Sequence, residues 1–509
     1  MSRVAIVGGG LSGLAAAYAL SRRAAEPWRA SGAAPDVVLI ERAARFGGKI
    51  HTARRDGLII ERGPDSFLAR KPAIRALIHA LGLTDMLAAV GPEGRGSYIW
   101  HAGRLHAIPE GLSAGIPTRL RPLFATSLLT PRGKLRAALD LVISRGPEGD
   151  ESLGAFLERR FGHEVRRRIA EPLLAGIYAG DVDRLSLMAT FPQFKNLERA
   201  HRSLLLAMFR ARRAHPAAST SPRYGASAPD PKTHLPFAGG AEALPPWPEA
   251  VRGSTFLSLK GGLADLVEAL EKALEEGGTQ LVRGVGVQSV RRDGEVYRLI
   301  LDDGATIDAD ALILAVPPTE ARRLFGAGGA PFDALAASTA YASVANVALW
   351  FDERVMHRLP PGSGFVVARG EGRRIAACTW TTRKWPHTTP PGQALFRLYI
   401  GGAGDDTAER LDDESLIALA RAELQATLGI AEAPVGALPT RWLGAMPQYA
   451  VGHLDRLKAL RKALAETLPG VFVAGSAYDG VGLPDVAESG RRAAEAVQRY
   501  MESVKGDRR

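Results

Sequence analysis

One glycine-rich stretch near the N-terminus, VAIVGGGLSGLAAAYAL at residues 4–20, constrains the fold more than any other feature. Its first four residues predict a buried parallel strand, and its Ala-rich second half predicts a helix. Gly8, Gly10 and Gly13 give the spacing G-x-G-x-x-G at the turn between them. Glycines so spaced permit a tight turn, close approach of the backbone to a pyrophosphate, and close packing of helix on strand. The helix N-terminus then offers free N–H groups to phosphates, so the stretch predicts an α/β fold that binds a dinucleotide.

A second apolar run, residues 37–40, ends in Glu41. A carboxylate at the end of the second strand can accept both ribose hydroxyls of an adenosine. It follows Gly13 by 28 residues, further than the usual spacing of about 20, and we interpret the gap as a loop insertion. A plain structural turn is the alternative to the dinucleotide site. The motif does not distinguish NAD from FAD.

Composition limits the class of protein. A chain of 509 residues suggests about three domains, and 46% hydrophobic with 23% charged residues is typical of a globular protein. The single cysteine, Cys378, excludes an intrachain disulfide and any multi-cysteine metal site. The net charge of +11 has no nucleic-acid-binding module to go with it. A membrane-surface patch, a cationic cleft for an anionic substrate, or simply Arg-rich solvated faces remain open.

The pattern along the chain predicts a discontinuous arrangement. Amphipathic helices dominate residues 113–210, where Arg159, Arg160 and Arg166 to Arg168 suggest a basic, solvated face. Residues 334–351 are uncharged and their second half alternates like a strand, so we interpret the stretch as sheet rather than a membrane span. The predicted domains are 1–70, 253–320 and 440–509 for the dinucleotide; 71–112 and 321–439 for a mixed-sheet substrate domain; 113–210, helical; and 211–252, a flexible Pro/Ala/Ser-rich insertion.

Longer motifs occur throughout the chain. They are ERGPDSF at 61–67, EPLLAGIYAGD at 171–181, CTWTTRKWPH at 378–387, RWLGAMPQYAVGH at 441–453 and AGSAYDGVGLPDVAESG at 474–490. Together with the N-terminal glycines, they resemble the FAD-dependent porphyrinogen oxidases of haem synthesis, within the amine-oxidase-like flavoprotein superfamily. The central motifs look most like the coproporphyrinogen III oxidases of the coproporphyrin-dependent pathway, and protoporphyrinogen oxidases are the alternative.

The resemblance implies a non-covalently bound FAD and a set of residues around it. The pyrophosphate would lie at Gly8, Gly9, Gly10, Leu11, Ser12 and Gly13, and the ribose at Glu41 beside Arg42. Lys49, Gly63, Pro64, Asp65 and Ser66 would follow the flavin, and the backbone of Val287 would meet the adenine. Trp442 would flank the isoalloxazine, which Ser476, Val481, Gly482 and Leu483 would close.

The implied reaction is the six-electron oxidation of a porphyrinogen, with hydride passing from a meso carbon to flavin N5 and dioxygen returning as hydrogen peroxide. We expect no catalytic side chain and no metal, because the cofactor carries the chemistry. Lys71 and Arg397 are the predicted partners of substrate propionates, and Ile177 would pack on the macrocycle. A solvated helix start is the alternative for Lys71, and an ordinary core residue is the alternative for Ile177.

We expect the chain to be cytoplasmic. Peripheral membrane contact and the choice between monomer and dimer are left open. Rival functions are a flavin amine oxidase or desaturase, a pyridine-nucleotide dehydrogenase, and a basic binding module without catalysis.

Overall fold

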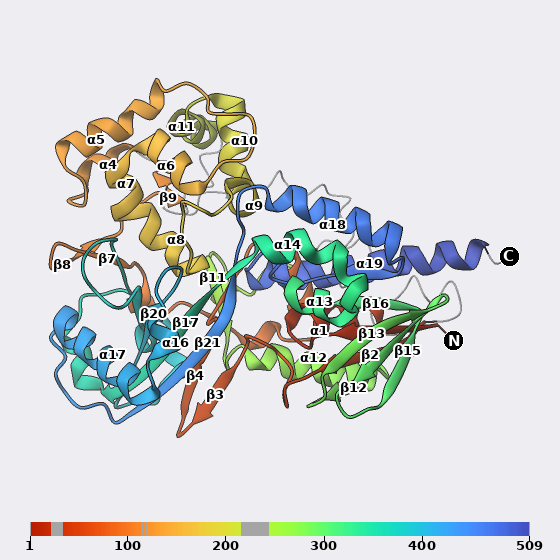
Figure 1. Cartoon of the computed structure of the whole chain (residues 1–509). Helices are drawn as coiled ribbons and strands as arrows, with labels where there is room; N and C mark the ends of the chain where they lie inside the picture. The colour runs from red at the N-terminus through yellow and green to blue at the C-terminus, as the bar shows by residue number, and fades with distance from the viewer. Residues whose placement is uncertain (1, 22–33, 114–115, 118–119, 215–243, 508–509) are drawn as a thin grey trace.

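A computed structural model describes residues 2–21, 34–113, 116–117, 120–214 and 244–507. Three parts are visible in Figure 1: a nucleotide-type sheet with its helices, a second long-stranded sheet, and a helical lobe. The long strand β21 (Gly436–Gln448) runs through the second sheet toward the first.

The first sheet is five-stranded and parallel, in the order β12-β2-β1-β16-β22. It collects segments from distant parts of the chain: β1 (Arg3–Val7), β2 (Asp36–Glu41), β12 (Gln280–Arg283), β16 (Ala311–Leu314) and β22 (Val471–Val473). Helix α1 (Leu11–Leu20) follows β1 directly. The strand, glycine turn and helix predicted from residues 4–20 are therefore confirmed.

Both faces of this sheet are covered, because alternate residues of a strand point to opposite sides. Val4 and Ile6 pack in a core that includes α1, α3 (Pro72–Ala80), α12 (Ala264–Glu276) and α19 (Leu483–Asp507). Ala5 and Val7 pack in another core on the opposite side. That core contains β13 (Val287–Asp293), β14 (Val296–Leu301), β15 (Thr306–Ala309), α13 (Pro318–Phe325), α14 (Asp333–Ser338) and α18 (His453–Thr467).

The second sheet has seven strands in the order β21-β17-β20-β19-β18-β7-β8 and is antiparallel except between β18 and β7. Besides β21, its strands are β17 (Ala340–Asp352), β20 (Gln393–Gly401), β19 (Ala377–Trp380), β18 (Gly364–Val367), β7 (Tyr98–His101) and β8 (Arg104–Ala107). Helix α17 (Asp413–Leu428) covers one face. Residues 340–351 lie in β17, which confirms sheet for most of the predicted stretch, but residues 334–338 lie in helix α14, so the sheet prediction is wrong for them. In the described part of the chain, no helix is both long and apolar enough to cross a membrane.

The helical lobe lies beside the second sheet (Figure 1). It consists of α4 (Leu120–Ala125), α5 (Pro131–Ala138), α6 (Leu153–Phe161), α7 (His163–Val165), α8 (Glu171–Tyr178), α9 (Leu187–Thr190), α10 (Pro192–His201) and α11 (Leu204–Ala214). Shorter pairings complete the fold: β3 (Thr52–Arg55) with β4 (Leu58–Glu61), and β11 (Phe256–Leu259) between β5 (Phe67–Leu68) and β6 (Leu87–Ala89).

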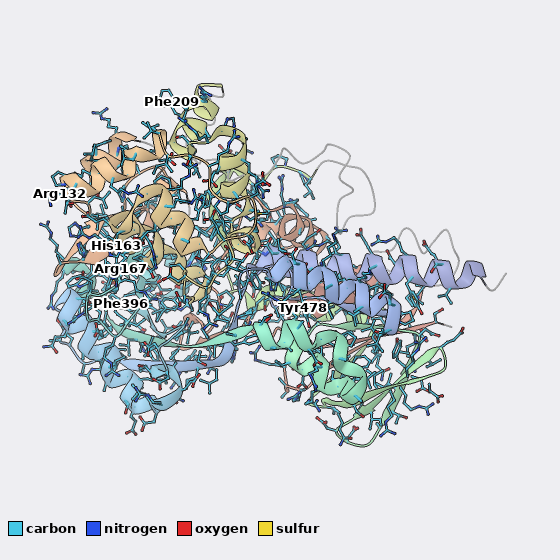
Figure 2. All side chains as sticks on the ribbon, turned by 45° about the horizontal axis from the view of Figure 1, so that its top comes forward. Arg132, His163, Arg167, Phe209, Phe396 and Tyr478 are labelled. Carbon is cyan, nitrogen blue, oxygen red and sulfur yellow. The ribbon has the colours of Figure 1, made fainter. Side chains whose placement is uncertain are left out.

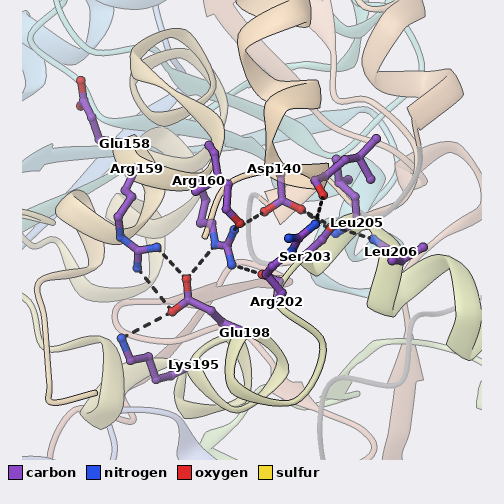
Figure 3. A network of polar contacts seen from close by, with 12 residues as sticks. Asp140, Glu158, Arg159, Arg160, Lys195, Glu198, Arg202, Ser203, Leu205 and Leu206 are labelled. Carbon is purple, nitrogen blue, oxygen red and sulfur yellow. Dashed lines mark hydrogen bonds and ion pairs between the residues drawn. The ribbon is translucent and has the colours of Figure 1, made fainter. Parts of the chain in front are cut away.

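The basic, solvated face predicted on the lobe is wrong for four of its five arginines, since only Arg167 is exposed and the other four are ion-paired. Arg160 is completely buried and pairs with Asp140 at 3.2 Å and Glu198 at 2.8 Å. Arg159 pairs with Glu198 at 2.6 Å, and Lys195 contacts the same carboxylate (Figure 3). These charges stabilise one another inside the lobe instead of facing solvent.

Packing also differs from the predicted domain limits in three places. Helix α3 and residues 321–338 were predicted to belong to the substrate domain. They pack on the first sheet instead, because their apolar faces meet the cores on its two sides. Strand β21 pairs with β17 and so belongs to the second sheet up to Gln448. Most of the predicted insertion, residues 215–243, lies outside the described residues. Its described end is packed, since Trp247 donates to the Ala69 carbonyl at 2.9 Å and stacks on His79.

Candidate functional site

A cavity of about 920 Å³ connects the first sheet with the second. It begins at the carboxyl ends of β1 and β16, where Gly8, Gly10 and residues 315–317 line it. It continues along β17 and reaches α8 and the segment 366–377. Ligands of open α/β sheets bind outside the carboxyl ends of the strands, so one end of the cavity lies where a dinucleotide is expected.

Two positions of the glycine turn, Gly8 and Gly13, have no room for a side chain. Gly8 has φ +105°, and a Cβ there would lie 2.6 Å from the carbonyl oxygen of Ala315. At Gly13 a Cβ would lie 1.9 Å from the carbonyl oxygen of Gly8. Leu11 and Ser12, in the first turn of α1, line the cavity and present the N-terminal end of the helix to it.

Glu41 lines the same end of the cavity. Its two carboxylate oxygens accept from the amides of Gly9 at 2.7 Å and Ala43 at 2.8 Å, which fix the orientation of the side chain. Gly9 and Gly13 belong to the glycine turn but do not line the cavity. Arg42 pairs with Glu320 at 2.5 Å and is largely exposed, and the buried Val287 gives its carbonyl to Arg323. The structure places neither Arg42 nor Val287 on the cavity wall.

Lys49 is the one lysine of the predicted cofactor set, and it lines the cavity. Burial lowers the pKa of Lys49 to about 8. Its Nζ lies 3.3 Å from Ser476 Oγ, and no carboxylate pairs with it in the part of the chain that the structure describes. A desolvated ammonium without a counter-ion is suited to an electron-rich or anionic edge of a ligand.

The turn at residues 63–66 lines the middle of the cavity and is held by the second sheet. Three side chains from three adjacent strands donate to three consecutive carbonyls. Asn346 Nδ2 of β17 donates to Glu61 O at 3.0 Å, Trp442 Nε1 of β21 donates to Arg62 O at 2.7 Å, and Arg397 Nη2 of β20 donates to Gly63 O at 2.6 Å. The segment predicted to follow the flavin is thus fixed to the sheet opposite the nucleotide.

Asp65 is the charged centre of this turn. Burial on its own would raise the pKa of Asp65, but Lys384 and Arg397 outweigh burial and hold it well below its usual range. The carboxylate lies 2.9 Å from Lys384 Nζ and 3.2 Å from Arg397 Nη1, and Trp385 Nε1 donates to it at 3.3 Å. Asp65 stays ionised and neutralises two cations beside the cavity.

The C-terminal glycine turn closes the cavity from the other side. Ser476, Val481, Gly482 and Leu483 line it, and α19 begins there. The Tyr449 hydroxyl donates to the Ser476 carbonyl and accepts from the Gly480 amide. The positive end of the α19 dipole therefore faces the cavity, where it would stabilise a flavin that becomes negative on reduction.

Of the three predicted substrate residues, only Ile177 lies in the cavity wall, with 47% of its surface exposed. The structure does not place Lys71 in the cavity wall: its Nζ pairs with Asp485 at 2.5 Å and joins α3 to α19. It does not place Arg397 there either. The Arg397 side chain is fully buried, and its guanidinium contacts Asp65 and the Gly63 carbonyl.

Sequence reasoning missed several polar residues that line the cavity. Asn346 is 4% exposed, and since the Glu61 carbonyl can only accept, the amide nitrogen must face it. Its Oδ1 then has no partner among the described residues, which indicates a donor on a ligand. Glu171, Arg369 and Arg374 also line the cavity. Nothing in the one-dimensional pattern brings these residues together, because they meet only when the sheet and lobe pack.

Comparison with known proteins decides the family. The model for flavin containing amine oxidoreductases matches residues 11–498. This chain belongs to that family. It is an FAD-dependent oxidoreductase with the amine-oxidase-like flavoprotein fold.

Named relatives match it over nearly the whole length. The coproporphyrinogen III oxidase of Bacillus subtilis is 39% identical, with 98% of each chain covered. That of Staphylococcus aureus is 34% identical over 97% of this chain and 98% of its own. Human protoporphyrinogen oxidase is 32% identical over 97% and 98%.

Solved structures agree on the fold. A protein from Exiguobacterium sp. 255-15, assigned as a protoporphyrinogen oxidase, superposes with a TM-score of 0.81 at 33% identity, covering 98% of this chain and 99% of its own. Putrescine oxidase matches at a TM-score of 0.64 and 18% identity, covering 98% and 99%, and shows the fold alone.

The residues present fit FAD. The glycine turn and Glu41 suit the pyrophosphate and ribose, and the unpaired Lys49 and the N-terminal end of α19 suit the polar edge of a flavin. Among the described residues, no group of three His, Cys, Asp or Glu side chains could hold a metal.

Proposed function

We propose that this chain oxidises coproporphyrinogen III to coproporphyrin III, removing six electrons and six hydrogens in three cycles with three dioxygen molecules, each of which becomes hydrogen peroxide. When bound, FAD would accept the hydride and would be reoxidised by dioxygen. The proposal is supported by one observation above all: the cavity that begins at the glycine turn continues, as one space of about 920 Å³, to α8 and the second sheet. A macrocycle needs such a chamber, whereas a small amine does not.

In this proposal the chain's own residues bind and orient. Ile177 of α8 packs on the macrocycle. Asn346 Oδ1, the buried acceptor without a partner, takes a pyrrole N–H and so holds one edge of the substrate toward the turn at residues 63–66. Asp65, kept ionised by Lys384 and Arg397, holds that turn in place.

The test is an aerobic assay of the purified yellow protein on coproporphyrinogen III and protoporphyrinogen IX, followed by porphyrin fluorescence. We expect the larger kcat/KM with coproporphyrinogen III and three hydrogen peroxide per porphyrin. Turnover of neither porphyrinogen would contradict the proposal.

Protoporphyrinogen IX oxidation is the second candidate. It is supported by the 32% identity to the human enzyme and by the similarity to the Exiguobacterium structure. A clear preference for protoporphyrinogen IX in the same assay would favour it and leave the family unchanged.

A further inference from the structure

The outer wall of the cavity is formed by the segment 369–374, RGEGRR, which joins β18 to β19. Every residue of this segment lines the cavity, and Arg369, Gly370, Gly372 and Arg374 are exposed. Gly370 and Gly372 have φ of +88° and +68°, which turns the backbone twice within six residues. The segment therefore borders both the chamber and solvent, and it carries three arginines.

Most charges around this opening are already neutralised. Arg369 Nε lies 3.1 Å from Oε1 of the buried Glu171, and Arg373 faces Glu423 at 3.7 Å. Glu371 accepts from the amide of Ala102 at 2.8 Å and lies 2.6 Å from His101 Nδ1.

Two guanidiniums are different, that of Arg374 in the cavity lining and that of Arg167, which is not in the lining but lies beside Gly370. The amide of Arg374 donates to Glu423 at 3.1 Å, but its side chain has no acidic partner within the described ranges. The exposed Arg167 has none there either, and its Nη2 lies 3.7 Å from the point that a Cβ on Gly370 would occupy. Its carbonyl accepts from the Arg369 amide at 3.4 Å, which places the lobe against the segment. Figure 2 shows Arg167 on the side of the lobe that is turned toward the second sheet, where Phe396 lies.

We propose that Arg374 and Arg167 form a carboxylate-binding site at the opening of the cavity, which takes propionates of the porphyrinogen. This inference rests on the proposed function and adds the residues that bind the substrate's charged periphery. A planar guanidinium donates two parallel hydrogen bonds to a carboxylate. Here two guanidiniums without an acidic partner among the described residues lie at the solvent end of a largely apolar cavity. The macrocycle would lie inside the cavity, and its carboxylates would bind these guanidiniums at the rim. The site replaces the one predicted at Lys71 and Arg397.

The test uses the FAD-loaded protein and the variants Arg374→Gln, Arg167→Gln and the double variant. Arg354→Gln is the matched control, because Arg354 pairs with Asp352 at an exposed strand end that does not line the cavity. Partly exposed charge pairs contribute modestly, so we expect KM for coproporphyrinogen III to rise about fivefold in each single variant and about 20-fold in the double variant. The effect should fall on KM rather than kcat. FAD content and thermal midpoint are measured for every variant.

Two further arms separate charge from shape. Arg374→Lys keeps a cation and should recover part of the lost affinity, because lysine binds a carboxylate as a point charge. The dissociation constant of coproporphyrin III, followed by its fluorescence, should rise with salt in the wild type and much less in the double variant.

The outcomes are distinguishable. If KM rises with both porphyrinogens, the rim takes the propionates that the two substrates share; if only with coproporphyrinogen III, it takes the additional pair. If the wild type oxidises a porphyrinogen while the double variant keeps its KM and its affinity for coproporphyrin III, the inference is overturned and the proposed function stands. If the wild type oxidises neither porphyrinogen, the proposed function fails, and unchanged coproporphyrin III binding in the double variant would overturn the inference independently.

Discussion

Replacing Asp65 by Asn should cost far more than an ordinary surface substitution. The carboxylate neutralises Arg397, whose side chain is fully buried, and Lys384, whose side chain is 20% exposed. Asn is nearly the same size, so the change removes charge with little change in volume. Lys384 can turn toward solvent, but Arg397 cannot, and it keeps only its bond to the Gly63 carbonyl.

The size of the loss follows from that arrangement. Removing one partner of a buried ion pair typically costs about 3–5 kcal/mol, because the remaining charge is left uncompensated. Since Arg397 keeps one carbonyl acceptor, we expect the lower end, about 3 kcal/mol. The turn at residues 63–66 should loosen as well, so the variant should also hold FAD more weakly.

The measurement is urea unfolding of the apoprotein, with FAD affinity from fluorescence titration. Glu466→Gln on α18, an exposed pair with Lys462 at 3.8 Å, is the control and should change stability by less than about 0.5 kcal/mol. The double variant Asp65→Asn with Arg397→Met removes both charges and should be more stable than the single variant. If Asp65→Asn is as mild as the control, or the double variant is worse than the sum of the single variants, the reasoning about the uncompensated Arg397 is refuted.

Three other predictions follow from groups around the cavity and from one buried carboxyl beyond it. Burial raises the pKa of Glu61 to about 7, so the folded chain binds that proton more tightly than the unfolded chain. The free energy of unfolding should therefore fall by about 3 kcal/mol between about pH 4.5 and 7. Urea unfolding at both pH values should show that Glu61→Gln loses this dependence. Lys49→Met should raise the dissociation constant of FAD about tenfold at pH 7. Titration at pH 9 should show a smaller difference, because the wild-type lysine has a pKa of about 8 and is then largely neutral. An equal ratio of dissociation constants at both pH values would contradict the charge argument. Asn346→Ala should lower kcat/KM for the porphyrinogen by about threefold to tenfold in steady-state kinetics. It removes the neutral bond proposed from substrate to Oδ1 as well as the bond from Nδ2 to the Glu61 carbonyl, so FAD content is measured beside it, and an unchanged kcat/KM would show that Oδ1 contacts no substrate.

Local patterns predicted the glycine turn and Glu41, which the structure brings to one end of the cavity. The steric cause at Gly13 is local, the carbonyl of Gly8, and Glu41 ends the strand that pairs with β1, whereas at Gly8 the cause is the distant carbonyl of Ala315. The substrate half depends far more on distant contacts. The sequence shows that Arg397 lies on a strand, but both faces of β20 are buried, and no pattern tells that its guanidinium is used by Asp65.

Arg160 and Lys71 illustrate the same limit. A run of arginines looks like a solvated face until Asp140 and Glu198, from other parts of the lobe, are packed against it. Lys71 follows the turn at residues 63–66 in sequence, yet the helix it begins leads away from the cavity and sets its amine against Asp485. Charge partners that meet only through packing cannot be inferred from spacing, whether they are 20 residues apart like Asp140 and Arg160 or 414 apart like Lys71 and Asp485.

The three carbonyls held by Asn346, Trp442 and Arg397 explain why such distant pairs matter here. Each bond is weak alone, but together they fix consecutive peptide groups of residues 61–63 to three neighbouring strands of a sheet. A displacement of the turn must then break all three or bend the sheet, and a packed sheet resists small deformations. The cavity wall that follows the flavin and the sheet that bounds the substrate chamber are thereby one rigid unit. In the proposed reaction, hydride transfer would depend closely on the distance between flavin and substrate, and we expect this unit to help set that distance.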